Sequence, residues 1–138
     1  MLFDGTGYEC HGQSEKTVVL IHGVGLNRFV WQPQLAALTR RYRMVTYDLL
    51  GHGESKRPFA DAALSHYVDQ LYGLLNQLHI EKTAVIGHSM GALISVAFAL
   101  AHSQMVEALV PMNIVYQRTP EQQTAVIGRA NQVLSAGK

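Results

Sequence analysis

The sequence predicts an α/β fold built on a mostly parallel, doubly wound sheet. Short apolar runs of strand length alternate along the chain with segments whose apolar residues recur at helical spacing. One of these runs leads directly into a serine flanked by glycines, and a helix-like segment follows it. Such alternation implies parallel neighbouring strands joined by right-handed crossovers.

The first half of the chain supplies two of the expected strands. Residues 17–21 (TVVLI) are apolar at consecutive positions after Thr17, which is typical of a strand buried on both faces. Residues 29–41 carry apolar residues at helical intervals, and residues 43–47 form a second short strand. Residues 48–55 (DLLGHGES) are then expected to form a glycine-punctuated loop.

The second half of the chain repeats this alternation. Ser65 is expected to cap a helix whose apolar stripe continues to Leu78, and residues 83–86 form the third strand. A helix over residues 92–102 and a fourth strand over residues 106–115 follow. The expected order is therefore that of a crossover fold with four consecutive strands.

Two features qualify the last part of the chain. Because proline cannot donate a hydrogen bond to a sheet, Pro111 in the fourth strand indicates an edge strand or a bulge. Residues 119–122 (TPEQ) form a capping box with proline at the first helical position, and the helix that they begin runs to Gly137. The apolar side of this helix, which includes Val126 and Leu134, needs a partner surface.

The strongest chemical signal is a G-x-S-x-G turn between the third strand and the next helix. Gly87 and Gly91 flank Ser89 at positions where side chains would collide with the tightly folded backbone. Such a turn lifts the serine oxygen clear of the sheet, and the helix directs its unpaired N–H groups and positive dipole end to the same place. Ser89 is therefore the expected nucleophile, and an ordinary turn with a capping serine is the structural alternative.

Composition and charge exclude several classes of protein. The chain of 138 residues is 48% hydrophobic and 15% charged, which is typical of a globular domain. Its formal net charge of +1, with scattered Lys and Arg, offers no surface for nucleic acid or an anionic membrane. No apolar stretch approaches the roughly 20 residues that span a bilayer, and the first residues lack the features of a secretion signal. Because Cys10 is the sole cysteine, we expect a reducing, cytoplasmic location.

Three segments together resemble the α/β-hydrolase superfamily. They are residues 20–27 (LIHGVGLN), 47–55 (YDLLGHGES) and 85–92 (VIGHSMGA). With Trp31, they are more narrowly similar to the 3-oxoadipate enol-lactonases, the non-haem haloperoxidase-like esterases and the meta-cleavage-product hydrolases, which use no cofactor.

The resemblance covers only the N-terminal half of the usual fold. It implies a partial α/β-hydrolase fold from which the C-terminal strands and most of the cap are missing. Residues 1–118 then form the N-terminal part of the core, and residues 119–138 form the start of a cap-like helical segment.

The resemblance also assigns roles to individual residues. Ser89 would attack the carbonyl carbon of a carboxylic ester or lactone to form an acyl-enzyme, and the backbone N–H groups of Val24 and Met90 would form the oxyanion hole. The residues that support these motifs are His22, Gly23, Gly87, His88 and Gly91. No cofactor and no metal are expected, because no histidine pair stands four residues apart on a helix face with an acid nearby, and no nucleotide loop follows a strand.

The rest of the catalytic triad has no evident source in this chain. In the family the acid and the histidine follow the serine along the sequence. His102 and Glu107 follow Ser89, but they are expected at the far end of the elbow helix and at the opposite edge of the sheet. His22 is expected to brace its loop rather than replace the base, and Asp48 is expected to organise the loop that follows it.

Two hypotheses about function remain from the sequence. In the first, the chain is an incomplete or complementing portion of a serine hydrolase, and a second polypeptide or a swapped copy supplies the missing strands, acid and histidine. In the second, it is a non-catalytic fragment or binding module that retains the hydrolase scaffold. The expected ligand in the first case is a small ester or lactone.

Overall fold

A six-stranded sheet forms the centre of the computed structural model, which describes residues 1–114 and 117–137. The strand order is β1-β2-β4-β3-β5-β6. Strands β4, β3, β5 and β6 are parallel, whereas β1 and β2 are antiparallel to their neighbours. The strands are β1 (Leu2–Phe3), β2 (Thr6–His11), β3 (Thr17–Ile21), β4 (Arg43–Tyr47), β5 (Thr83–His88) and β6 (Val106–Met112).

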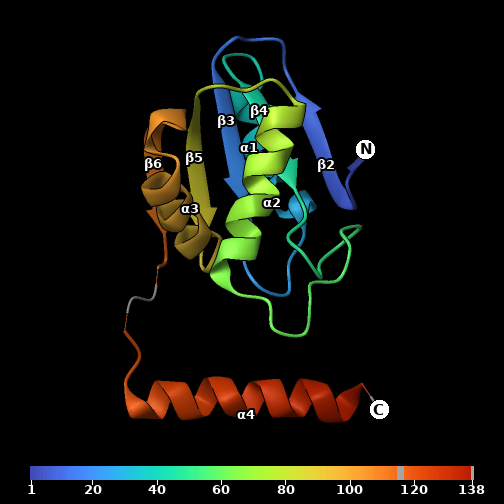
Figure 1. Cartoon of the computed structure of the whole chain (residues 1–138), viewed down its shortest axis with the longest axis vertical. Coiled ribbons are helices and arrows are strands. Elements are labelled where there is room, and N and C mark those ends of the chain that lie inside the picture. Colours follow the sequence, from blue (N-terminus) through green and yellow to red (C-terminus); the bar gives the residue numbers. More distant parts are fainter. Residues whose placement is uncertain (115–116, 138) are drawn as a thin grey trace.

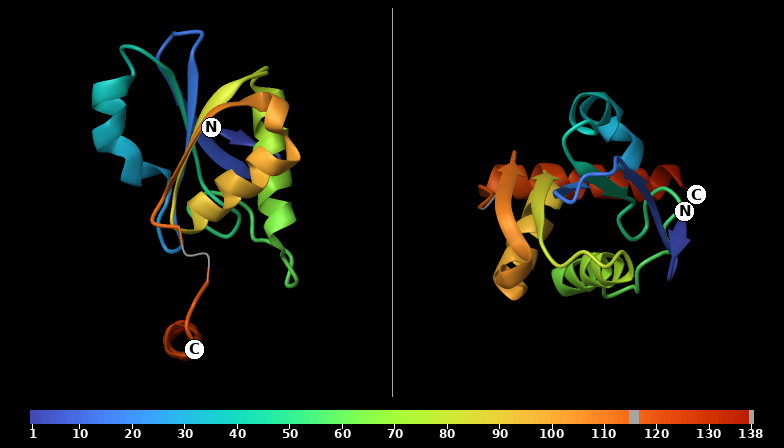
Figure 2. Two further views of the ribbon diagram at one scale, coloured as in Figure 1. Left: turned by 90° about the vertical axis from the view of Figure 1, so that its left-hand side faces the viewer. Right: turned by 90° about the horizontal axis from the view of Figure 1, so that it is seen from above.

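Helices cover both faces of the sheet, so the fold is doubly wound. Helix α1 packs on one face, and α2 and α3 pack side by side on the other (Figures 1 and 2). The helices are η1 (Arg28–Trp31), α1 (Gln32–Leu38), α2 (Leu64–Gln77), α3 (Met90–Ala101), η2 (Ser103–Met105) and α4 (Pro120–Ala136), where η marks a 3-10 helix.

The two faces of the central strand β3 enter two different apolar cores. Val19 and Ile21 pack with residues of α2 and α3, and Val18 and Leu20 pack with Trp31 and other residues on the α1 side. Successive side chains of a strand point to opposite faces, so a strand covered on both faces must be apolar at consecutive positions. This arrangement explains the sequence of β3 and confirms the expected buried strand.

The N-terminal strands β1 and β2 were not anticipated. Strand β2 pairs antiparallel with β4, with Tyr8 opposite Tyr47. Its sequence, TGYECH, mixes polar, charged and aromatic residues. The strand is held by pairing with β4 and has no continuous apolar run that would identify it from the sequence.

Several element boundaries differ from those expected. The expected helix over residues 29–41 is a 3-10 turn followed by the shorter helix α1, because Pro33 is tolerated only in the first turn of an α-helix. Ser65 does not cap α2: the N-cap is Ala63, whose N–H donates to Nδ1 of His66 at 2.8 Å. Helix α3 begins at Met90, two residues earlier than expected.

Pro111 lies in the edge strand β6, as expected. The Met112 carbonyl accepts a hydrogen bond from the Ser89 N–H, so the backbone of Met112 faces β5 and the nitrogen of Pro111 faces the free edge. The strand ends at Met112 because Asn113 takes a φ of 53°, outside the extended region. The expected end at Val115 lies outside the described residues.

Helix α4 begins with the expected capping box. The Thr119 side chain accepts a hydrogen bond from the Gln122 N–H, and the Gln122 side chain accepts one from the Thr119 N–H. The helix has no buried residues, and Figure 1 shows it apart from the sheet, below the edge at which β3 and β5 end. Neither α4 nor any other described helix has the length and apolar character that crossing a bilayer requires.

Candidate functional site

Ser89 occupies a sharp turn between β5 and α3. Its φ of 57° and ψ of −116° lie outside the regions that non-glycine residues normally populate. The Ser89 N–H donates to the Met112 carbonyl at 3.0 Å, which ties the turn to β6, and the Ser89 side chain is exposed. The residue that the sequence singled out therefore sits on a strained bend, where the alternative of a capping serine in an ordinary turn does not apply.

Both glycines of the motif are required by close backbone contacts. A Cβ on Gly87 would clash with the Gly91 carbonyl, and a Cβ on Gly91 would clash with the carbonyls of Ile21 and His22. The first turn of α3 therefore lies directly against the end of β3, at a distance that only glycine allows. This contact brings the serine turn beside the loop that follows β3.

That loop begins with a tight turn at residues 23–26, in which the Leu26 N–H donates to the Gly23 carbonyl at 3.3 Å. Gly25 has a φ of +76°. A Cβ built on Gly23 would lie 3.2 Å from the Cβ of Ser89, so the 23–26 turn lies next to the serine. Within the described residues, neither the Val24 N–H nor the Met90 N–H donates to a protein acceptor.

The His22 side chain hydrogen-bonds to the first residue of this turn. Its imidazole is fully buried, with Nδ1 2.8 Å from the Gly23 carbonyl oxygen, and its Nε2 accepts a hydrogen bond from the Leu49 N–H at 3.0 Å. Since a carbonyl only accepts, Nδ1 carries the proton and the ring is neutral. Burial lowers the pKa of His22 below its ordinary value. Both ring nitrogens are therefore occupied, and neither is free to act as a base for Ser89.

An ion pair between Arg28 and Asp48 joins the start of η1 to the end of β4. The Asp48 carboxylate is fully buried and accepts hydrogen bonds from the Arg28 N–H at 2.7 Å, from the Arg28 guanidinium and from the Glu54 N–H at 3.0 Å. Arg28 also donates to Glu54 at 2.7 Å. Asp48 thus organises the loop over residues 48–55, as expected.

Arg28 itself was missed in the sequence analysis. It is 5% exposed although it is charged, and its carboxylate partners explain this burial. A single charge among the apolar residues Leu26, Phe29 and Val30 was the signal that it is paired and buried.

Two further histidines lie near the serine turn. His52 accepts a hydrogen bond at Nε2 from the Gly25 N–H at 3.1 Å, and its Nδ1 lies 3.1 Å from the Leu50 carbonyl. His88 ends β5 and packs beside Gly23, on which a Cβ would lie 3.3 Å from the His88 Nδ1. The His52 imidazole therefore joins the 23–26 turn to the loop over residues 48–55, and the His88 imidazole lies next to Gly23.

His102 and Glu107 lie far from Ser89. Helix α3 has 12 residues and is therefore about 18 Å long, and His102 follows its last residue. There the His102 ring stacks on Tyr72, with 4.3 Å between ring centroids. Glu107 is exposed near the N-terminal end of β6, whereas the serine turn follows the C-terminal end of the neighbouring parallel strand β5.

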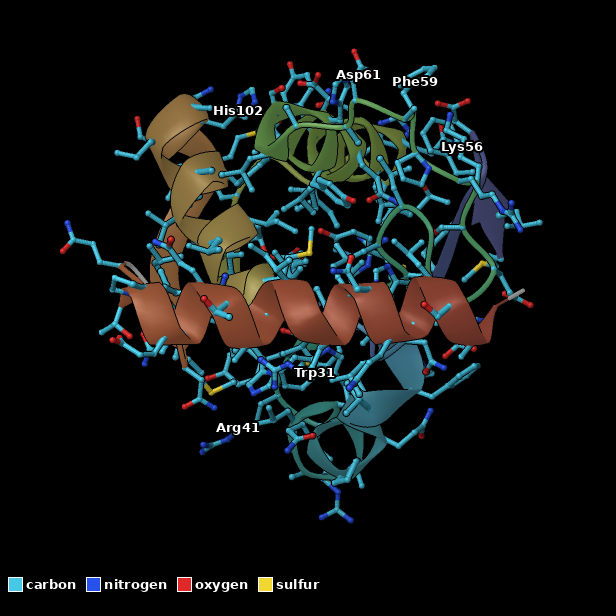
Figure 3. The ribbon with its side chains drawn as sticks, turned by 90° about the horizontal axis from the view of Figure 1, so that it is seen from below. Trp31, Arg41, Lys56, Phe59, Asp61 and His102 are labelled. Atoms are coloured by element: carbon cyan, nitrogen blue, oxygen red, sulfur yellow. The ribbon has the colours of Figure 1, made fainter. Side chains whose placement is uncertain are left out.

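A second carboxylate after Ser89, Glu121, was overlooked in the sequence analysis. It lies exposed in the first turn of α4, where hydrogen bonds from its own N–H and from Thr119 lower the pKa of its carboxyl. Figure 3 looks onto the edge where the strands end, with α4 in front and the labelled Trp31 on the α1 side. Glu121 thus lies on α4, which has no buried residues and stands apart from the sheet (Figure 1).

The described residues contain no group of three or more His, Cys, Asp or Glu side chains that could hold a metal ion. Two cavities of about 360 and 430 Å³ lie around the N-terminal ends of β5 and β6, and Ser89 lines neither.

Comparisons with known proteins agree with this fold. A family model described as alpha/beta hydrolase fold matches residues 16–132. The chain is 36% identical over 113 residues to (E)-2-((N-methylformamido)methylene)succinate hydrolase of Acinetobacter baylyi, covering 82% of this chain and 43% of the relative. It is 40% identical over 114 residues to the putative carbamate hydrolase RutD of Yersinia enterocolitica, covering 82% of this chain and 40% of the relative.

Solved structures give the same result. An enol-lactonase from Burkholderia xenovorans superposes with a TM-score of 0.82 at 28% identity, covering 91% of this chain and 50% of that one. A meta-cleavage product hydrolase from Pseudomonas fluorescens gives a TM-score of 0.77 at 30% identity, covering 83% of this chain and 43% of that one. The chain spans 40–43% of the length of the two curated relatives above. Fold, motif geometry and similarity together show that the chain belongs to the α/β-hydrolase family and carries the N-terminal portion of its fold.

Proposed function

We propose that this chain provides the nucleophile and the oxyanion hole of a serine hydrolase that cleaves carboxylic esters or lactones. The observation that carries the proposal is the exposed Ser89 on its positive-φ turn, beside the 23–26 turn. The unpartnered amides of Val24 and Met90 flank it in the described residues.

The reaction proceeds through an acyl-enzyme. The Ser89 oxygen attacks the carbonyl carbon, its proton passes to a base, and the carbonyl oxygen becomes negatively charged in the tetrahedral intermediate. The N–H groups of Val24 and Met90 stabilise that oxygen, and the N-terminus of α3 adds its positive dipole end. When the intermediate collapses, the carbon–oxygen bond to the alcohol breaks, and the base returns the proton to the leaving oxygen. Water then hydrolyses the acyl-enzyme. Each oxyanion donor contributes about 3 to 4 kcal/mol to such a transition state.

The chemistry of the relatives supports this substrate class. The matched proteins include an enol-lactonase, a protein named putative carbamate hydrolase and a meta-cleavage product hydrolase. All three names denote hydrolases, and a lactone or an ester carbonyl fits the oxyanion hole proposed here.

Among the described residues, His102 lies about 18 Å along α3 from the serine turn, and both nitrogens of His22 are occupied. Neither histidine is therefore placed to act as the general base of Ser89. We include in the proposal a second polypeptide, or a swapped second copy, that brings further strands, an acid and a histidine beside Ser89. Residues 119–138 are then the start of a cap-like segment, and residues 1–118 the N-terminal part of the core.

The solitary Cys10 supports a cytoplasmic location for this assembly. A thiol that has no cysteine partner in the chain is stable in a reducing compartment.

Covalent labelling by a fluorophosphonate tests the proposal. Because an oxyanion hole retains part of the catalysis when the triad is incomplete, we expect slow labelling of the chain at Ser89 and none of Ser89→Ala, with the slow serine-dependent hydrolysis of p-nitrophenyl acetate lost in parallel. Ser65→Ala removes an exposed serine of α2 and is the matched control. Absence of labelling in the unaltered chain would support instead a non-catalytic fragment or binding module that keeps the scaffold.

A further inference from the structure

Hydrogen bonds join the loop over residues 48–55 to the segment that follows β3. One is from the Leu49 N–H to Nε2 of His22, and another is from the Gly25 N–H to Nε2 of His52. We propose that His52 is the positioning residue of this turn: by accepting the Gly25 N–H, it fixes the turn's central peptide, which adjoins the peptide that carries the Val24 N–H beside Ser89. The inference about the Val24 amide rests on the proposed function, whereas the fixing of the turn does not.

The backbone of the 23–26 turn can adopt two conformations. Turns of types I and II differ by a flip of the central peptide, here the one between Val24 and Gly25. The φ of +76° at Gly25 is that of a type II turn, but glycine also adopts the negative φ of type I without penalty. No heavy atom lies within 4 Å of a Cβ built on Gly25, so packing against Gly25 does not oppose either form. The hydrogen bond to the Gly25 N–H favours the form in which that N–H points to its acceptor.

His52 is prepared to supply that hydrogen bond. Its Nδ1 lies 3.1 Å from the Leu50 carbonyl, so Nδ1 carries the proton and Nε2 presents a lone pair to the Gly25 N–H. The ring is further held by an edge-to-face contact with His22, with 5.2 Å between centroids. If the central peptide flipped, the Gly25 N–H would leave Nε2 and the Val24 carbonyl would turn toward it.

Two histidines therefore hold two consecutive peptides. The Nδ1–H of His22 holds the carbonyl of the peptide that also contains the Val24 N–H, and His52 holds the next peptide. The Val24 N–H is the one group of this pair left without a protein acceptor in the described part of the chain. The pair of imidazoles thus fixes the turn and leaves free the amide that is proposed to bind the oxyanion.

Nitrogen-15 NMR of the 138-residue chain tests this inference. In the unaltered chain we expect His52 in the neutral form with the proton on Nδ1. His52→Phe keeps a ring against His22 but removes the acceptor, so the Val24 and Gly25 signals should shift and broaden, with amide exchange at Gly25 faster by about tenfold or more. His52→Gln restores an acceptor near the Nε2 position and should return both signals toward those of the unaltered chain.

His66→Phe is the matched control. It removes an imidazole that accepts a backbone N–H, that of Ala63 in the N-cap of α2, and that has no hydrogen bond to the 23–26 turn among the described residues, so it should leave Val24 and Gly25 unchanged. Unchanged Val24 and Gly25 signals in His52→Phe, or a His52 ring protonated on Nε2, would overturn the inference. The tautomer measurement needs no variant and so holds even if His52→Phe fails to fold.

Labelling by the fluorophosphonate separates this inference from the proposed function. If both are correct, His52→Phe lowers the labelling rate on the order of tenfold, and His52→Gln recovers it. If the unaltered chain is not labelled, the proposed function fails, and the NMR results alone decide whether His52 fixes the turn. NMR changes without any change in labelling rate would show that the fixed turn does not serve Ser89.

Discussion

The imidazole of His22 makes folding sensitive to pH. Its burial lowers the pKa of the folded state below the ordinary 6.5, so the unfolded chain binds a proton more readily than the folded one. The contribution of His22 to stability is therefore complete above pH 6.5 and is lost progressively as the pH falls below it. We expect the free energy of unfolding in urea to decrease from pH 7.5 to pH 5.

His22→Gln provides the control for this prediction. Glutamine has no titrating group in this range, but its carbonyl oxygen can still accept the Leu49 N–H. The variant should lose part of the pH dependence and keep the rest, which comes from other groups. Equal slopes of unfolding free energy against pH in the two proteins would contradict the assigned role of burial.

At the residue scale, the sequence predicted the position of the serine turn better than the side-chain contacts around it. Ser89, Gly87 and Gly91 could be assigned because a G-x-S-x-G turn needs those residue types whatever surrounds it. The Arg28–Asp48 pair could not be assigned, because the two residues are 20 positions apart and only the fold brings them together. Their partnership depends on the register of β3 and β4, which no local pattern specifies.

At the scale of elements, the contact between α3 and β3 determines where the serine turn lies. Gly91→Ala would place a methyl group against the carbonyls of Ile21 and His22, and neither backbone can move without disturbing the sheet. We expect a loss of about 1–3 kcal/mol in the free energy of unfolding, as for other overpacked interiors. Chemical denaturation followed by circular dichroism measures this change.

Gly73→Ala is the matched control in helix α2. A Cβ on Gly73 has no neighbour within 4 Å, so the alanine should stabilise the helix by about 0.5–1 kcal/mol. The two substitutions add the same methyl group to helical glycines and should change stability in opposite directions. If both stabilised the protein, α3 would not lie as close to β3 as the structure places it.

Apolar periodicity predicted the central elements and failed at the margins of the fold. Strands β3, β4 and β5 begin where expected because they are buried, and burial leaves a continuous apolar signal. Strands β1 and β2 have no such signal, because antiparallel pairing at the sheet margin tolerates polar residues on consecutive positions. Helix α4 was predicted from its capping box, a local signal that does not depend on packing.

At the scale of the whole molecule, the free side of β6 is a surface to which a strand of another chain can pair. This strand forms one edge of the sheet, and its outward residues Ala108, Val110 and Pro111 are exposed. Helix α4 exposes a second apolar surface, with Val133 and Leu134 each about 70% accessible to solvent. Unpaired edges and exposed apolar side chains both favour association with another chain.

We therefore expect the isolated chain to associate with itself as its concentration rises. Native mass measurement and analytical ultracentrifugation should show species heavier than the 15.2 kDa monomer. Val110→Lys places a charge on the free edge strand, and edge lysines oppose strand pairing between chains, so the variant should shift the equilibrium toward the monomer. Gln34→Lys adds the same charge on the exposed side of α1 and should leave association unchanged. A monomer at every concentration would contradict this expectation and would indicate that Pro111, whose nitrogen faces that edge, already opposes pairing.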